Sequence, residues 1–174
     1  MSEPAPRPIV YYGDPVLHRP CQTVEKFDEE LAELVDVMFA SMYAADGVGL
    51  AANQIGVDAR VFVMDCPDDD GGRVVAHVVN PTLLETPPPR ELKVDTEGCL
   101  SVPGQHAETP RVYTATVTGF DKTGEPIEVT ATGNAARCLQ HETDHLNGTV
   151  YVDRLPRKLR KKLLEAAGLP DRPR

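Results

Sequence analysis

The sequence predicts an α+β fold in which mainly antiparallel strands surround a central metal-bearing helix, with one further helix near each end of the chain. Three observations carry this prediction. A helical hydrophobic period lies near the start of the chain, short β-branched runs fill the middle, and two helical segments close it. Because helices and strands do not alternate one by one, the strands are not expected to form parallel βαβ units.

The first predicted helix runs from Asp28 to about Ala45. Acidic residues in its first turn and Gly47 just beyond its end suit the two ends of a helix. Two segments rich in Asp, Gly or Pro, 68–72 and 86–89, are expected to be surface loops. The apolar residues that recur with the helical period are Leu31, Leu34, Val35, Met38, Phe39 and Met42.

β-branched runs predict four strands, at 60–65, 74–81, 111–119 and 126–132. The segment FDKTGEP lies between the last two runs and predicts the loop of a hairpin.

Two more helices are predicted after the strands. One begins near Asn134, an acceptable cap residue, and stops at Gly148. The other begins around Pro156 and ends at Gly168.

Length and composition predict one domain over residues 1–174, with a C-terminal helix and tail at 157–174. A net charge of −9 disfavours a surface that binds nucleic acid or anionic membrane throughout, so we expect neither a membrane partner nor sequence-specific nucleic acid. The sequence shows no signal-peptide run and no stretch near the ~20 apolar residues of a membrane span. We therefore expect a cytoplasmic protein whose four cysteines are thiols.

The motif HETDH at 141–145 carries the clearest chemical signal. On a helix, His141 and His145 project from nearly the same face, one turn apart, and can bind one metal ion. Glu142 lies about 100° round from His141, where it can reach a water on that metal and act as a general base. A solvated polar helix face is the alternative reading of the motif.

A catalytic site of this kind takes three protein ligands and leaves one position open. In the metzincin pattern the third ligand would be a histidine, but Tyr151 stands at that position. In the gluzincin pattern it would be Glu165, which reads better as an exposed helix residue. Cys99, in the segment EGCLSVP, is a better candidate because Gly98 and Pro103 could fix its presentation, although a lone cysteine is more often a small buried side chain.

A third stretch, GVGLAANQIG at 47–56, follows the first helix; taken alone, it could be a turn without a function. Together and in this order, GVGLAANQIG, EGCLSVP and QHETDHLNG resemble the peptide deformylases, and the resemblance runs from about Pro8 to Leu164. It implies a single catalytic domain that removes the N-formyl group from the initiator methionine of nascent polypeptides and releases formate.

The resemblance also implies a role for each matching residue. Leu100 contributes through its backbone N–H, and Gly49 through main-chain pairing with the bound peptide. The implied set consists of the metal ligands Cys99, His141 and His145, the general acid/base Glu142, the oxyanion stabilisers Gln54 and Leu100, and the substrate-binding residues Gly49, Val48 and Cys138. Val48 and Cys138 would line the methionine pocket; ordinary core positions are the alternative for both residues.

Two residues depart from the family pattern. His106 stands where some members carry an arginine, and Asp95 stands where others are apolar. The preference for peptide sequence beyond methionine is therefore left open. His106 reads as a peripheral polar contact, because three metal ligands are already assigned.

The implied cofactor is one divalent metal ion, Fe(II) in the cell, with Zn or Ni possible in the isolated protein. The implied partners are N-formylmethionyl peptides and, through the basic run RKLRKK at 157–162, a transient contact with the ribosome; a solvated helix face is the alternative for that run. A zincin-type peptidase and a catalytically inactive metal-binding module are the competing functions.

Overall fold

The computed structural model of the protein describes residues 3–171. Within this part of the chain, helices and antiparallel strands combine as an α+β fold, as predicted. The helices are α1 (Glu29–Ala44), α2 (Gly133–Leu146) and α3 (Arg157–Ala167), with short 3₁₀ turns η1 (Pro15–His18), η2 (Ala52–Ile55) and η3 (Tyr151–Arg154). The strands are β1 (Gly49–Ala51), β2 (Val61–Pro67), β3 (Arg73–Leu83), β4 (Leu92–Cys99), β5 (Val102–Val112), β6 (Thr114–Phe120) and β7 (Pro126–Thr132).

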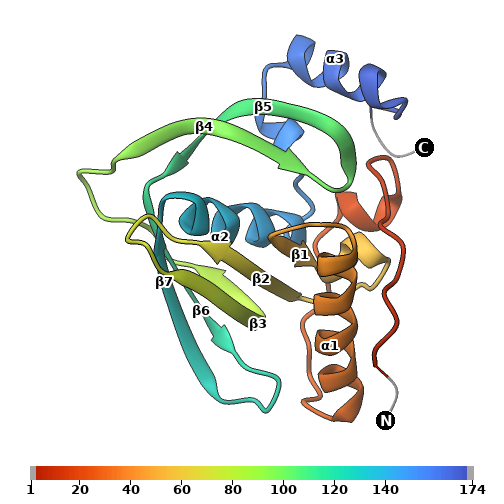
Figure 1. The fold of residues 1–174 in the computed structure, drawn as a ribbon, viewed down its shortest axis with the longest axis vertical. Coiled ribbons are helices and arrows are strands. Elements are labelled where there is room, and N and C mark those ends of the chain that lie inside the picture. Colours follow the sequence, from red (N-terminus) through yellow and green to blue (C-terminus); the bar gives the residue numbers. More distant parts are fainter. Residues whose placement is uncertain (1–2, 172–174) are drawn as a thin grey trace.

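Helix α2 lies between two antiparallel sheets (Figure 1). One sheet has five strands in the order β1-β2-β3-β6-β7, and the other is the hairpin of β4 and β5. α2 packs against every strand of the larger sheet and also against β5. The helix that carries the histidine motif is therefore enclosed by strands, in agreement with the fold predicted from the sequence.

Strand β2 of the larger sheet is buried on both faces. Along this strand Phe62, Met64 and Cys66 pack in one apolar cluster with residues of α2, while Val61 and Val63 pack in another with residues of α1. A strand covered on both sides reads as a continuous apolar run, as VFVM does. Each such side chain contributes about 1.5–3 kcal/mol on burial, so one cluster holds α2 and the other holds α1 against opposite faces of β2.

The predicted ends of the helices are close to those observed. Asp28 caps α1, with its carboxylate accepting a hydrogen bond from the N–H of Leu31 at 3.1 Å. Pro156 precedes α3, and Gly168 ends it in the left-handed conformation. The cap predicted at Asn134 is wrong by two residues, because α2 starts at Gly133 and its N-cap is Thr132.

The predicted strand at 111–119 is wrong, because the structure divides this run between β5 and β6 at Tyr113. The side chain of Gln140 on α2 accepts a hydrogen bond from the N–H of Val112 and donates one to its carbonyl, at 3.1 and 2.9 Å. These bonds occupy the N–H and carbonyl of Val112, which a single continuous strand would use to pair with a neighbouring strand. The hairpin predicted from FDKTGEP is confirmed by the pairing of β6 with β7.

Three strands, β1, β4 and β5, were not predicted. β1 has only three residues, and β4 exposes Leu92 and Val94 beside charged neighbours, so neither shows a clear alternation.

Near the C-terminus, Leu163 and Leu164 of α3 pack with Val102 of β5 in a third apolar cluster. None of the helices within residues 3–171 is both long and apolar enough to cross a membrane.

Gly148, which follows α2, has a φ of +84°, and a Cβ there would lie 2.8 Å from backbone atoms of Arg19. We predict that Gly148→Ala lowers the free energy of unfolding by about 3 kcal/mol or more, since both backbone strain and a backbone collision result. Gly168→Ala is the matched control: its φ is +73°, but nothing lies within 4 Å of its Cβ position, so a loss of about 1 kcal/mol is expected. Urea unfolding measures both, and equal losses would contradict the packing argument.

Candidate active site and metal centre

Three metal-ligating side chains converge between α2 and the end of β4. The Sγ of Cys99 lies 3.3 Å from Nε2 of His145, which lies 3.2 Å from Nε2 of His141. All three donor atoms fall within 4.8 Å of one another, and within the described residues no other such group of His, Cys, Asp or Glu is found. The structure thus brings together the three residues that the sequence indicated as ligands.

The donor set fits a divalent metal of borderline softness, because a thiolate and two imidazoles suit zinc, iron, cobalt or nickel. Burial lowers the pKa of His145 well below its usual value. The imidazole is therefore neutral, as a metal ligand must be. Oε1 of Glu142 is buried without a hydrogen-bond partner among residues 3–171, which leaves a polar atom that a water on the ion would satisfy.

Glu97 of β4 orients His141. Its carboxylate accepts a hydrogen bond from Nδ1 of His141 at 2.6 Å and is also bound by Arg111 at 2.7 and 3.0 Å and by Arg137 at 2.9 Å. Although burial raises the pKa of Glu97, the hydrogen bonds from His141 and Arg111 outweigh it and hold the pKa far below its usual value. A charged Glu97 keeps the proton of His141 on Nδ1, so that Nε2 faces the other two donor atoms.

The charge network continues behind the site. Arg111 also donates to Asp144 at 2.7 Å, and Asp144 accepts from Arg154 at 2.6 and 2.8 Å. This network joins β4, β5, α2 and η3. Sequence reasoning missed it, although Glu97 stands inside EGCLSVP and Asp144 inside HETDH.

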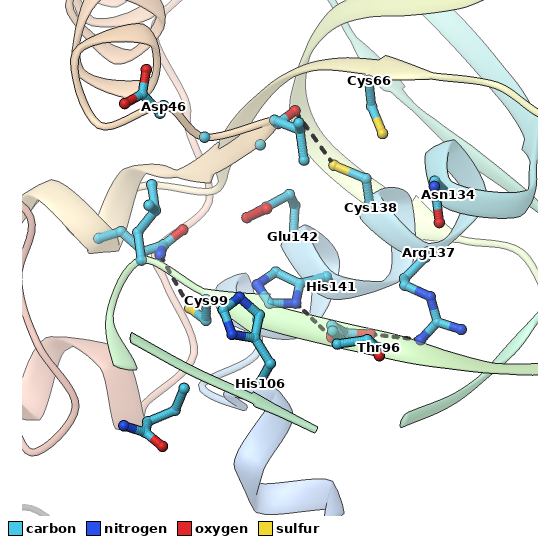
Figure 2. Close-up of a pocket in the computed structure, with 18 of the residues that line it drawn as sticks. Asp46, Cys66, Thr96, Cys99, His106, Asn134, Arg137, Cys138, His141 and Glu142 are labelled. Atoms are coloured by element: carbon cyan, nitrogen blue, oxygen red, sulfur yellow. Dashed lines mark hydrogen bonds and ion pairs between the residues drawn. The ribbon is translucent and has the colours of Figure 1, made fainter. Parts of the chain in front are cut away.

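Glu142 lies beside the three donor atoms, on the side toward β1. A Cβ on Gly49 would lie 2.6 Å from Oε2 of Glu142 and 2.6 Å from Sγ of Cys138, so only glycine fits at this point of β1. Figure 2 shows Glu142 between Cys138 and His141, facing the cavity. Burial raises the pKa of Glu142 to about 7.

The side chain of Gln54 is held in one orientation by both ends of its amide. Its Oε1 accepts a hydrogen bond from the N–H of Ala51 at 3.0 Å, and its Nε2 donates to Oγ of Ser101 at 3.1 Å. Nε2 also lies 3.5 Å from Sγ of Cys99. The donor end of Gln54 is therefore directed toward the thiol, and Ser101, which the sequence analysis did not single out, helps to direct it.

These groups open into one cleft of about 660 Å³, a volume suited to a small ligand or a side chain with its flanking backbone. Every site residue predicted from the sequence lines it except His145, which is fully buried behind the others. Val48, at the rim, is 49% exposed, and Cys138, in the wall, is 6% exposed. The predicted residues in the lining are Val48, Gly49, Gln54, Cys99, Leu100, Cys138, His141 and Glu142.

The residues considered as alternatives lie elsewhere or make other contacts. Tyr151 stacks against the ring of His141, with centroids 6.2 Å apart, and its hydroxyl donates to a backbone carbonyl. Glu165 is exposed on α3. His106 pairs with Gly98 across the β4-β5 hairpin and lines the cleft without joining the donor group, whereas Asp95 is not among the lining residues.

Comparisons with known proteins agree on one family. The family model of the polypeptide deformylases matches residues 6–161. Peptide deformylase 2 of Streptomyces avermitilis is 56% identical over 165 residues, which cover 94% of this chain and 88% of that protein. Peptide deformylase 2 of Streptomyces coelicolor is 56% identical over 158 residues, covering 91% and 87%. The crystal structure of peptide deformylase from Ehrlichia chaffeensis superposes with a TM-score of 0.87 at 35% identity, covering 94% and 96%.

Glu97 offers a test of how the network supports the donor group. We predict that Glu97→Gln lowers metal affinity about 10- to 100-fold, since His141 loses its charged partner. We also expect the free energy of unfolding to fall by about 3–5 kcal/mol, because Arg111 and Arg137 lose their buried counter-charge. Metal titration and urea unfolding measure the two effects.

The matched control is Glu85→Gln, which removes a carboxylate that pairs with Arg90 at 2.8 Å but is 84% exposed. It should leave both quantities nearly unchanged. An equal response of the two variants would contradict the proposed support.

Proposed function

The chain belongs to the peptide deformylase family, and on that premise we propose how its residues remove the N-formyl group from the initiator methionine of nascent polypeptides. The family consists of metal-dependent hydrolases that act on formylated peptides in protein biosynthesis. The observation that carries the residue assignment is the convergence of Cys99, His141 and His145 beside Glu142 in one cleft.

Cys99, His141 and His145 would hold one divalent metal ion through Sγ and the two Nε2 atoms. When bound, the ion supplies Lewis acidity, which polarises the formyl carbonyl and makes water easier to deprotonate. The hydrogen bond from His141 to Glu97 supports this assignment because it leaves Nε2 free to bind.

Glu142 would transfer the proton. Its carboxylate faces the cleft beside the donor atoms, within reach of a water that attacks the formyl carbon. Glu142 accepts a proton from that water and returns it to the amine nitrogen as the bond to the formyl carbon breaks, so formate and a free N-terminus are released. Two hydrogen-bond donors, Nε2 of Gln54 and the backbone N–H of Leu100, would stabilise the negative charge on the former carbonyl oxygen.

The peptide would bind along β1. This strand lies at the end of the sheet order and pairs with β2 on one side, so its other edge is available to an extended chain. Gly49 would pair with the peptide through its main chain, since the absence of a Cβ lets it approach Glu142 closely. Val48 and Cys138 would form apolar walls for the methionine side chain.

The remaining proposals concern location and cofactor. A substrate that consists of nascent chains supports a cytoplasmic location. Helix α3 presents exposed cations that would contact the ribosome transiently, namely Arg157, Lys158, Lys161 and Lys162, whereas Arg160 is paired with Asp171 at 2.8 Å. Ferrous iron is the proposed metal in the cell, with zinc or nickel as alternatives in the isolated protein.

Release of formate from a formyl-methionyl peptide tests the function directly. A deformylase releases formate and leaves the peptide otherwise intact. A zincin-type peptidase would instead cleave unformylated peptides internally, and an inactive metal-binding module would do neither. The assay should be run on the metal-loaded protein, with metal content measured alongside.

The role of Glu142 predicts that Glu142→Ala abolishes deformylation while metal content stays near one per chain, because the carboxylate serves the water and not the ion. Cys99→Ala is the contrasting variant and should release the metal. Elemental analysis and formate release separate the two. Loss of metal from Glu142→Ala, or normal retention by Cys99→Ala, would contradict the assignment.

The role of Gln54 predicts that Gln54→Ala lowers kcat by about 100-fold or more with the metal retained, since one donor to the developing charge is lost. Gln54→Glu keeps the shape of the side chain but replaces the donor with a carboxylate oxygen, so it should be impaired at least as strongly. Steady-state kinetics at fixed metal content give the answer. An unchanged kcat in either variant would exclude Gln54 from this role.

The metal is tested by stripping the protein and reloading it without oxygen with Fe(II), Ni(II) or Zn(II). We predict the highest formate release per bound metal with iron or nickel, although zinc outcompetes ferrous iron in affinity. The iron form should lose activity in air, because its metal and the half-buried thiolate of Cys99 are both open to oxidation, and anaerobic reloading should restore it. A zinc form as active as the other two would refute the preference.

A further inference from the structure

Two thiols face each other in the wall of the cleft. Cys66 lies near the end of β2, Cys138 lies on α2, and both line the cavity. Both also belong to one apolar cluster, and each thiol shifts the pKa of the other. Figure 2 shows the sulfur of Cys66 directed toward Cys138, on the side of the cleft away from His106. Neither thiol belongs to the donor group of the metal centre.

Cys138 also contacts the strand along which the peptide would bind. Its Sγ lies 3.8 Å from the carbonyl oxygen of Val48 and would lie 2.6 Å from a Cβ on Gly49. The sulfur of Cys138 is therefore shared between two neighbours, a thiol of β2 behind it and the backbone of β1 in front of it. A displacement of Sγ of Cys138 therefore alters the wall of the cleft beside β1, where the substrate would bind.

The two other cysteines have different surroundings. Cys21 is buried in the same apolar cluster but does not line the cleft, and burial raises its pKa to about 11. Cys99 belongs to the metal-binding group. The chain thus holds one pair of thiols in mutual contact at a cavity wall, with an unreactive buried thiol that serves as an internal control.

We propose that Cys66 and Cys138 form an oxidation site, which hydroperoxides convert to a reversible disulfide that changes the apolar wall of the cleft. The effect of the disulfide on substrate rests on the proposed function; its formation does not. A peroxide is small enough to enter the cavity that both residues line. Both side chains are short and lie in one apolar cluster, with the sulfur of Cys66 directed toward Cys138, an arrangement that suits an S–S bond.

The chemistry divides the two thiols into nucleophile and resolving thiol. Interaction with Cys138 lowers the pKa of Cys66, whereas interaction with Cys66 and burial raise the pKa of Cys138 well above its usual value. The Cys66 thiolate attacks one peroxide oxygen, the O–O bond breaks, and hydroxide leaves, which gives a sulfenic acid. The sulfur of Cys138 then attacks the sulfenic sulfur, its proton leaves with the departing hydroxyl as water, and the S–S bond forms. Two thiol hydrogens are lost, and the peroxide is reduced to water.

The disulfide would pull Sγ of Cys138 toward β2. The sulfur can then no longer donate to the carbonyl of Val48, and the wall beside Gly49 changes shape. In an apolar pocket, one extra or missing methylene changes kcat/KM by about 10- to 200-fold. We therefore expect oxidation to lower kcat/KM for a formyl-methionyl peptide by about tenfold or more, and a dithiol reductant to restore it.

The test uses nickel-loaded protein treated with limiting hydrogen peroxide, followed by intact mass measurement and peptide mapping. The expected product has lost two hydrogen atoms, contains a linked peptide pair that holds Cys66 and Cys138, and reverts with dithiothreitol. If the thiols are consumed and this pair does not form, the proposal is overturned. Mass does not depend on turnover, so a protein that fails to release formate still gives a clear answer.

Variants assign the bond to its residues. Cys21→Ser should still form the linked pair, whereas Cys66→Ser and Cys138→Ser should not. Cys66→Ala replaces Cys66→Ser if the buried hydroxyl impairs folding. In the wild-type protein, kcat/KM should fall when the disulfide forms and recover when it is reduced. In Cys66→Ser, peroxide should leave kcat/KM near its untreated value. A disulfide that forms without any change in wild-type kcat/KM would overturn the claimed effect on the cleft.

Discussion

The burial of a polar helix is the constraint on which the rest of the structure depends. α2 packs against the five strands of the larger sheet and against β5, yet it carries Arg137, His141, Glu142, Asp144 and His145, each less than a tenth exposed. Charged groups are stable in an interior only when they are paired or bind a metal. The partners come from β4, β5 and η3, and their positions set the shape of the hairpin that closes the site.

Three glycines let the backbone come close to side chains that line the cleft. Added Cβ atoms at Gly47, Gly49 and Gly98 would collide with Leu100, Glu142 and His106 respectively. In each case the glycine backbone lies so close to a side chain of the cleft that an added Cβ would force that side chain to shift. Gly47 and Gly49 thereby mark contacts between different motifs, whereas Gly98 marks a contact within the β4-β5 hairpin.

The sequence predicted those features that depend on neighbours along the chain. The period of α1, the β6-β7 hairpin and the spacing of His141 and His145 are local patterns, whereas Cys99 required the combination of three motifs. The pairing of Glu97 with Arg111 was not predictable, because it depends on the register of β4 against β5, where Glu97 faces Ala107 and Arg111 faces Lys93. Charges fourteen positions apart reveal no such partner until the hairpin is known.

The short edge strand β1 has a consequence for selectivity. In the proposed binding mode, a chain that extends the sheet at Gly49 would be held through amide and carbonyl groups, which nearly all amino acids possess. These main-chain contacts would recognise an extended backbone of almost any sequence, and three residues of strand suffice to provide them.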